Sequence, residues 1–274
     1  MKLKTLFLLL LFAFTDSVAH ANISVTCSLF PVYDFTRNIA GDSADVKLLL
    51  PPGVEPHEYA PSPRDIKALN DSDIFIFTCA EFESWAVKIS QSLNDTRIID
   101  ASEGITLVNN DPHIWLDLTL AQRMVMNILR GLCETDPDNS QTYTRNAESL
   151  CSKLRELDER FTAMKKDKAI IFAGEFSAGY FVRRYGYEYL SAYEGENEPS
   201  VKRMAEIIRH IQQTKAKYIF TDINENTSVA REISAQTGAK ILTFGTGHMI
   251  PDENITFVEI MNGNYENISE AMND

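Results

Sequence analysis

The chain is poor in cysteine. Its 274 residues include four cysteines, and no two of them have C-x-x-C spacing, which argues against a cysteine-based metal or redox centre. In an oxidising compartment, Cys27, Cys79, Cys133 and Cys151 could form disulfides. Cys27 and Cys79 each end a β-like run, so a bridge between them could form if the two strands are neighbours. Cys133 and Cys151 would then pair, or remain as small buried hydrophobic residues.

Long hydrophobic runs are also scarce. The apolar run from Leu6 to Phe14 is too short to span a bilayer, and Lys2 and Lys4 precede it. An A-x-A cleavage site ends at Ala21, so the pattern predicts a signal peptide over residues 1–21 that is cleaved after Ala21. The residue directly after the predicted cut is Asn22 and not a cysteine, and a lipid anchor is therefore not expected. The expected location is the periplasm.

Basic residues are outnumbered by acidic ones. The formal net charge is −13, with 26 Lys and Arg against 39 Asp and Glu, and this argues against nucleic acid as a partner. The chain also lacks H-E-x-x-H, G-x-S-x-G and a glycine-rich phosphate loop. These absences favour a protein that is not an enzyme.

What is present is an alternation of β-branched runs with helical patterns, which is typical of parallel sheets covered by helices. Strands are expected at Ile23–Ser28, Asp45–Leu50, Asp73–Thr78, Arg97–Ile99, Ala169–Ala173, Tyr189–Ser191, Lys217–Thr221 and Lys240–Thr243. Helices are expected at Tyr33–Ala40, Pro63–Asn70, Glu83–Leu93, Leu118–Thr135, Pro137–Met164, Gly179–Tyr185, Ser200–Lys215 and Ser228–Thr237. The fold class is therefore α/β.

The two halves of the chain look alike. The run Ile23–Ser28 and the helix after it are echoed by Ala169–Ala173 and the helix after that, which predicts two similar lobes. The expected units are an N-terminal lobe over 22–135, a connecting helix over 136–166 and a C-terminal lobe over 167–274. No glycine- or serine-rich linker interrupts them.

Two of only five histidines lie in proline-stiffened loops. His57 follows Pro56 in a loop after the expected strand Asp45–Leu50, and His113 follows Pro112. Loops at the carboxyl ends of parallel strands line the ligand crevice of an α/β sheet. Neutral imidazole is the commonest ligand for zinc and similar ions, so this pair of loops indicates a metal site.

At these residues the chain resembles the TroA-like solute-binding proteins of ABC transporters, which take up zinc or manganese. The resemblance covers nearly the whole chain after the signal peptide. It rests on Leu50–Pro63, Asp111–Asp117, Phe30–Phe35, Asp136–Asn139 with Tyr143 and Asn146, Ala178–Phe181 with Tyr185 and Gly186, Glu198–Ser200, and Thr237–Lys240. It implies two α/β lobes joined by one long helix, with the metal held in the cleft between the lobes.

The resemblance also implies a set of metal ligands. The family's first two histidines fall on His57 and His113, and its third ligand falls on Glu175. The fourth, usually an aspartate before a T/S-Y-x-x-M pattern, falls on Ile255, which cannot bind a metal. His248 is the alternative we choose, with Asp252 second and a water molecule third.

The function that follows is capture of a divalent transition metal and its delivery to a membrane ABC permease by a monomeric periplasmic protein. Imidazole ligands favour Zn²⁺ over Mn²⁺, although the chain lacks the long His/Asp-rich loop of many zinc-uptake relatives. Two alternatives are a metal-dependent hydrolase with an open coordination position and an exported adhesin on the same scaffold. Glu58, Asp111, Asp117 and Asp222 are candidates for orienting the imidazoles, and Trp115 is expected to pack the wall of the cleft.

Overall fold

The computed structural model describes residues 22–52, 54, 59–174, 177–193, 199–223, 228–248, 250, 252 and 254–273. Within these residues the chain forms two parallel sheets of four strands each, with helices on both faces. None of the helices in these ranges is long and apolar enough to cross a membrane.

The first sheet has the strand order β2-β1-β3-β4. Its strands are β1 (Ile23–Cys27), β2 (Ala44–Leu48), β3 (Ile74–Phe77) and β4 (Arg97–Asp100). The helices of this lobe are α1 (Phe30–Ala40), α2 (Pro63–Asn70), α3 (Ser84–Ser90) and α4 (Leu118–Thr135). Short 3₁₀ turns lie at Gly41–Ser43 (η1), Ile114–Leu116 (η3) and Pro137–Asn139 (η4).

The second sheet repeats this arrangement in the order β6-β5-β7-β8. Its strands are β5 (Ile170–Phe172), β6 (Tyr189–Ser191), β7 (Tyr218–Thr221) and β8 (Lys240–Thr243). Its helices are α6 (Gly179–Tyr185), α7 (Val201–Thr214), α8 (Ser228–Thr237) and α9 (Phe257–Asn273). Because the strand order matches that of the first sheet, the prediction of two similar lobes is confirmed.

Local sequence explains where several helices begin. Ser62 and Asp65 form a capping box at α2, with Pro63 in the first turn, and Asp117 accepts hydrogen bonds from the amides of Thr119 and Leu120 at α4. Such caps satisfy amides that have no partner within the helix. They account for the agreement between the predicted and observed starts of these two helices.

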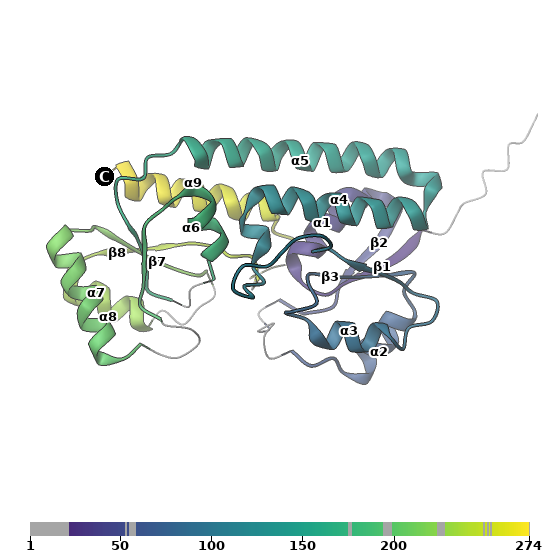
Figure 1. Cartoon of the computed structure of the whole chain (residues 1–274), viewed down its shortest axis with the longest axis horizontal. Coiled ribbons are helices and arrows are strands. Elements are labelled where there is room, and N and C mark those ends of the chain that lie inside the picture. The colour runs from purple at the N-terminus through teal and green to yellow at the C-terminus, as the bar shows by residue number, and fades with distance from the viewer. Residues whose placement is uncertain are drawn as a thin grey trace, which may run out of the picture.

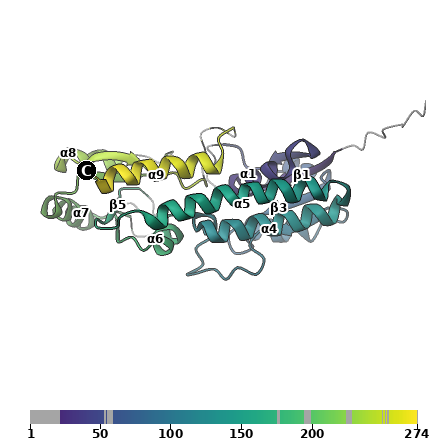
Figure 2. The same ribbon diagram turned by 90° about the horizontal axis from the view of Figure 1, so that it is seen from above.

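The long helix α5 (Ser140–Ala163) joins the lobes, as predicted. Its 24 residues span about 36 Å at 1.5 Å per residue. It follows the turn η4 and runs back beside α4, and its second half lies beside α9 (Figure 1; Figure 2). One hydrophobic cluster includes residues of both sheets together with Leu150, Leu154 and Phe161 of α5, so the lobes share a core.

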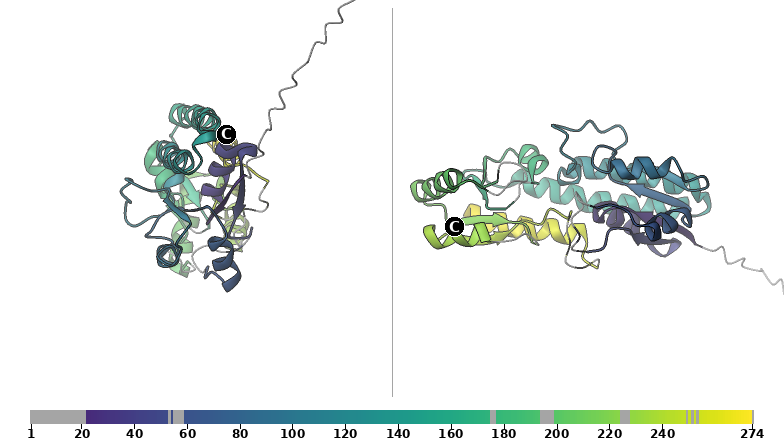
Figure 3. Two further views of the ribbon diagram at one scale, coloured as in Figure 1. Left: turned by 90° about the vertical axis from the view of Figure 1, so that its right-hand side faces the viewer. Right: turned by 90° about the horizontal axis from the view of Figure 1, so that it is seen from below.

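Two smaller clusters fill the other faces of the sheets. Phe75 and Phe77 of β3 pack with Leu69 and Ala86 of α2 and α3, and Ile171 and Ile219 pack with residues of α7 and α8. The end-on view shows α4 and α5 on one side and α2 and α3 on the other (Figure 3). Each sheet is thus the middle layer of three.

The cysteines correct one expectation. Strands β1 and β3 are neighbours, but Cys27, Cys79, Cys133 and Cys151 are all free thiols. Cys27 is paired in register with Ile76, so Cys79 lies three residues farther along, about 10 Å at the rise of a strand. The disulfide suggested by the sequence is therefore absent from the structure, and Cys27, Cys79 and Cys151 are buried.

Candidate metal site at the junction of the lobes

The candidate site is formed where the carboxyl ends of strands from both sheets meet. His113 follows β4 of the first sheet, Asp222 directly follows β7, and Thr246 and His248 follow β8. These are the positions at which parallel α/β sheets bind ligands. His113 and His248 are 6% and 4% exposed, so both imidazoles are almost completely enclosed by protein.

The orientation of His113 is set by the loop that precedes it. Asp111 Oδ1 lies 2.8 Å from His113 Nδ1 and also accepts a hydrogen bond from the His113 amide at 3.0 Å. An ionised carboxylate can only accept, so Nδ1 carries a proton, and in the neutral imidazole that binds a metal the lone pair is on Nε2. Phe82 and Trp115 pack on the ring, with centroid distances of 6.4 and 5.2 Å. This is the arrangement that prepares an imidazole to bind a metal through Nε2.

His248 is oriented through an intermediate hydroxyl group. Thr246 Oγ1 donates its hydrogen to Asp222 Oδ2, and the same oxygen lies 2.5 Å from His248 Nδ1. Because the single hydroxyl hydrogen is directed at the carboxylate, Oγ1 accepts from Nδ1–H. His248 therefore has the same tautomer as His113, with its lone pair on Nε2. The Thr246 amide also donates to Asp222 Oδ2, at 3.1 Å.

The two rings come from different lobes and lie side by side. Their centroids are 5.5 Å apart and their planes are inclined by 65°. Two imidazoles bound to one tetrahedral zinc through Zn–N bonds of about 2.1 Å have ring centres roughly 5 Å apart. The separation of His113 and His248 is therefore compatible with one shared ion.

The other expected ligands are placed as follows. His57 and Glu175 lie outside the described residues. The Asp252 side chain is exposed, and its Oδ1 accepts hydrogen bonds from the backbone and side-chain nitrogens of Asn254. Among the described residues, no group of three or more His, Cys, Asp or Glu side chains is arranged to hold a metal. The described part of the site is thus the histidine pair and the groups that orient it.

The supporting residues were only partly predicted. Asp111 contacts the His113 ring directly, and Asp222 is linked to His248 through Thr246. Trp115 is fully buried, with its Nε1 donating to the Thr246 carbonyl at 2.7 Å. Asp117 instead caps α4, and Glu58 lies outside the described residues. Sequence reasoning missed Thr246, although its position just after β8 is the same signal that pointed to Asp222 after β7.

The contribution of the Thr246 hydroxyl can be measured. Thr246→Val removes the hydroxyl at nearly constant volume, leaving His248 Nδ1 without this acceptor and Asp222 without this donor. We expect zinc affinity to fall by about 10- to 100-fold, the usual effect of losing a group that orients a ligand. Competition for zinc with a chromophoric chelator measures the affinity of the variant and of wild type. Thr243→Val, at an exposed position of β8 where the hydroxyl accepts from Asn267, is the matched control and should leave affinity unchanged.

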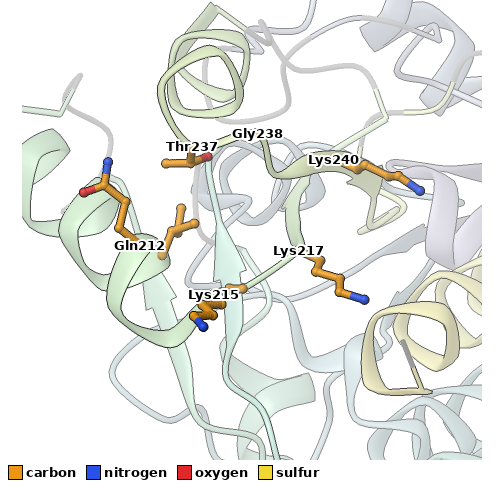
Figure 4. A pocket seen from close by; sticks show the side chains of 8 residues that line it. Gln212, Lys215, Lys217, Thr237, Gly238 and Lys240 are labelled. Atoms are coloured by element: carbon orange, nitrogen blue, oxygen red, sulfur yellow. The ribbon is translucent and has the colours of Figure 1, made fainter.

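A separate pocket lies at the amino ends of β7 and β8, at the opposite edge of the second sheet. It has a volume of about 490 Å³, and Lys215, Lys217 and Lys240 are among its lining residues (Figure 4). The ammonium groups of these lysines spread apart instead of converging on one point. This geometry does not favour binding of a small anion.

Comparison with known proteins decides the family. Residues 25–271 match the model of the zinc-uptake complex component A, periplasmic (ZnuA). The chain belongs to the ZnuA family. The resemblance to TroA-like metal-binding proteins of ABC transporters is thereby confirmed, and the family is one of metal-binding transport components.

Individual relatives agree with this membership. The chain is 28% identical over 279 residues to the high-affinity zinc uptake system protein ZnuA of Bacillus subtilis (strain 168), covering 91% of this chain and 88% of that protein. The zinc-binding lipoprotein AdcA of Streptococcus pneumoniae is 28% identical over 278 residues; 92% of this chain aligns with 54% of it, so the chain spans about half of its length.

Solved structures of ZnuA-like proteins share the fold. The Zn(II)-bound ZnuA-like domain of Streptococcus pneumoniae AdcA superposes with a TM-score of 0.82 at 26% identity, covering 93% of this chain and 100% of that domain. A laminin-binding protein of Streptococcus agalactiae, described as having adhesin and metal-transporting activity, superposes with a TM-score of 0.82 at 28% identity. The match covers 92% of this chain and 100% of that protein. The predicted fold, two lobes joined by a long helix, is confirmed.

Proposed function

We propose that this member of the ZnuA family binds Zn²⁺ between its lobes as cargo and delivers it to a membrane ABC permease from the periplasm, as a monomer. His57 and His113 bind the ion from the N-terminal lobe, and Glu175 and His248 bind it from the C-terminal lobe. The observation that carries the proposal is the buried histidine pair, contributed by both lobes and held in one tautomer.

The chemistry of the pair favours zinc. Neutral imidazole suits Zn²⁺, whereas a site richer in carboxylates suits the harder Mn²⁺. With His248 as the fourth ligand, the set contains three imidazoles and one carboxylate. The relatives named for zinc support the same choice.

The surrounding groups support tight binding at neutral pH. Asp111 and Asp222 supply two carboxylates close to the site, and these partly offset the charge of a dication in a buried environment. Each also acts on an imidazole, directly or through Thr246, so the rings need little reorganisation when the ion arrives. Four protein ligands close the coordination sphere, which suits transport better than hydrolysis.

Metal content and titration test this function. Mature protein stripped with a chelator is titrated with Zn²⁺ and with Mn²⁺ in competition, and the purified protein is assayed by elemental analysis. We expect one tightly bound equivalent with zinc preferred. An absence of stoichiometric metal would refute the proposal, and a clear preference for Mn²⁺ would overturn the choice of cargo.

Two further assays separate the alternatives. Metal-dependent turnover of simple esters or phosphoesters would favour a hydrolase with an open coordination position. Binding to immobilised laminin without metal would favour an adhesin. Under the proposed function, the zinc-loaded protein does not turn over these substrates and the metal-free protein does not bind laminin.

A further inference from the structure

The loop that carries His248 is held at both ends by side chains of the other lobe. This last loop, residues 244–256, connects β8 to α9 and belongs to the C-terminal lobe. Hydrogen bonds reach its described residues and the first residue of α9 from two separate places in the N-terminal lobe, the turn η3 and the helix α1.

The first end of the loop is fixed next to His248. Asn264 of α9 accepts from the Gly245 amide at 2.7 Å and donates to the Gly245 carbonyl at 2.8 Å. A Cβ on Gly245 would lie 2.7 Å from Ile260 and 2.8 Å from Ile223, so the backbone approaches these side chains as only glycine allows. Trp115 of the N-terminal lobe then holds the Thr246 carbonyl. This end is anchored from both lobes.

The second end is fixed by α1 of the N-terminal lobe. Asp34 Oδ2 accepts a hydrogen bond at 3.0 Å from the amide of Phe257, the first residue of α9, and Arg37 Nη2 donates to the carbonyl of Ile255. The two side chains form an ion pair at 2.8 Å. Phe35, between them in sequence, packs edge-on against Phe257 with a centroid distance of 5.3 Å. A helix start in one lobe is thus capped by a carboxylate from the other.

The position of Asp34 suits this task. Its side chain is fully buried, and burial raises the pKa of the carboxyl, while the Phe257 amide and Arg37 act in the opposite direction. An isolated buried carboxylate is costly, so its partners must stay in place for the charge to be tolerated. A negative charge at the first amides of α9 also interacts favourably with the helix dipole. These features favour one fixed arrangement of α1 and the end of the loop.

We infer that Asp34 and Arg37 are positioning residues for cargo binding: from the N-terminal lobe they hold the distal end of the last loop, and so keep His248 beside His113. Neither residue is expected to contact the ion. The inference rests on the proposed function for its effect on zinc, but its structural part applies to the metal-free protein as well.

The test compares Asp34→Asn and Arg37→Gln with wild type. Asn keeps an acceptor for the Phe257 amide but loses the charge, and Gln removes the guanidinium from a side chain that is 23% exposed and so tolerates replacement. We expect zinc affinity to fall by about tenfold in each, mainly through faster dissociation, measured by stopped-flow transfer to a chelator. Arg160→Gln is the matched control. Arg160 of α5 binds Asn262 and stacks on the ring of Tyr265, both of which belong to α9, so this variant should lose thermal stability but keep the wild-type dissociation rate.

A second readout needs no metal. Long-range ¹H–¹⁵N spectra of the metal-free protein report the tautomer of each histidine. In Asp34→Asn and Arg37→Gln, the His248 signals should shift toward a mixture of tautomers while those of His113, held by Asp111, stay unchanged. Unchanged His248 signals and an unchanged dissociation rate would overturn the inference. If the wild type binds no zinc but both variants still show shifted His248 signals, only the proposed function is refuted.

Discussion

Zinc affinity is expected to fall by more than about 100-fold when either His113 or His248 is replaced by alanine. Loss of a group that merely orients a ligand costs about 10- to 100-fold, and loss of the ligand itself should cost more. Both rings are almost fully buried, so each is held in place by the surrounding protein before the ion binds. Competitive titration of chelator-stripped variants against wild type measures the change.

The effect should be specific to the pair. His210→Ala on α7 removes a partly buried imidazole that lines a different pocket, and it should leave zinc affinity at the wild-type value. Unfolding by urea of the metal-free variants separates a binding defect from a folding defect. Retained affinity in His248→Ala would remove His248 from the ligand set and move the fourth position to Asp252 or to water.

Glu83 is expected to make the stability of the metal-free protein depend on pH. Its carboxylate accepts hydrogen bonds from the amides of Thr78 at 2.6 Å and Cys79 at 3.3 Å, and its side chain is buried. Burial raises the pKa of Glu83 from 4.5 to about 7, against the opposing effect of these amides and of the Ser28 and Thr78 hydroxyls. The folded protein therefore holds a proton on Glu83 over a pH range in which the unfolded chain has lost it.

The sign of the effect follows from that difference in proton binding. Because the native state binds more protons between pH 4.5 and about 7, the free energy of unfolding falls as pH rises through this range. The stabilisation is fully present below pH 4.5 and is lost above about pH 7, a change of about 3 kcal/mol. The thiols of Cys27 and Cys79 add nothing here, since burial raises the pKa of each to about 12.

Urea denaturation of wild type and Glu83→Gln from pH 4.5 to 8 measures the contribution of Glu83 to the free energy of unfolding. The variant should gain about 3 kcal/mol relative to wild type across the range, because glutamine does not ionise. Asp100, whose carboxyl pKa is also raised by burial, contributes equally to both proteins and cancels in the comparison. Glu148→Gln, at an exposed position of α5, should leave the wild-type pH profile intact. Parallel profiles for wild type and Glu83→Gln would contradict the prediction.

The positions of most helices and strands could be predicted from the sequence because their signals are local. Predicted and observed boundaries coincide for Pro63–Asn70, Leu118–Thr135 and Tyr189–Ser191. Capping residues, prolines and short β-branched runs mark such boundaries within a few residues of the chain.

The helix α9 was missed, and the reason is also physical. Its sequence contains Gly263 and several asparagines, which are poor helix formers, although Phe257, Ile260 and Met261 recur at helical spacing. Its first amide is satisfied by Asp34, which lies 223 positions earlier in the chain. A cap supplied from another lobe leaves no local signal.

The sequence by itself determined the α/β class, the repetition of two lobes, the long connecting helix and the choice of His113 and His248 as candidate ligands. Only the tertiary structure decided that these two rings lie 5.5 Å apart, that Thr246 links His248 to Asp222, and that the four cysteines stay free. The division has one physical cause. Propensity, capping and hydrophobic periodicity act over a few residues, whereas ring separation, tautomer and thiol pairing depend on contacts between residues far apart in sequence that only the packed lobes bring together.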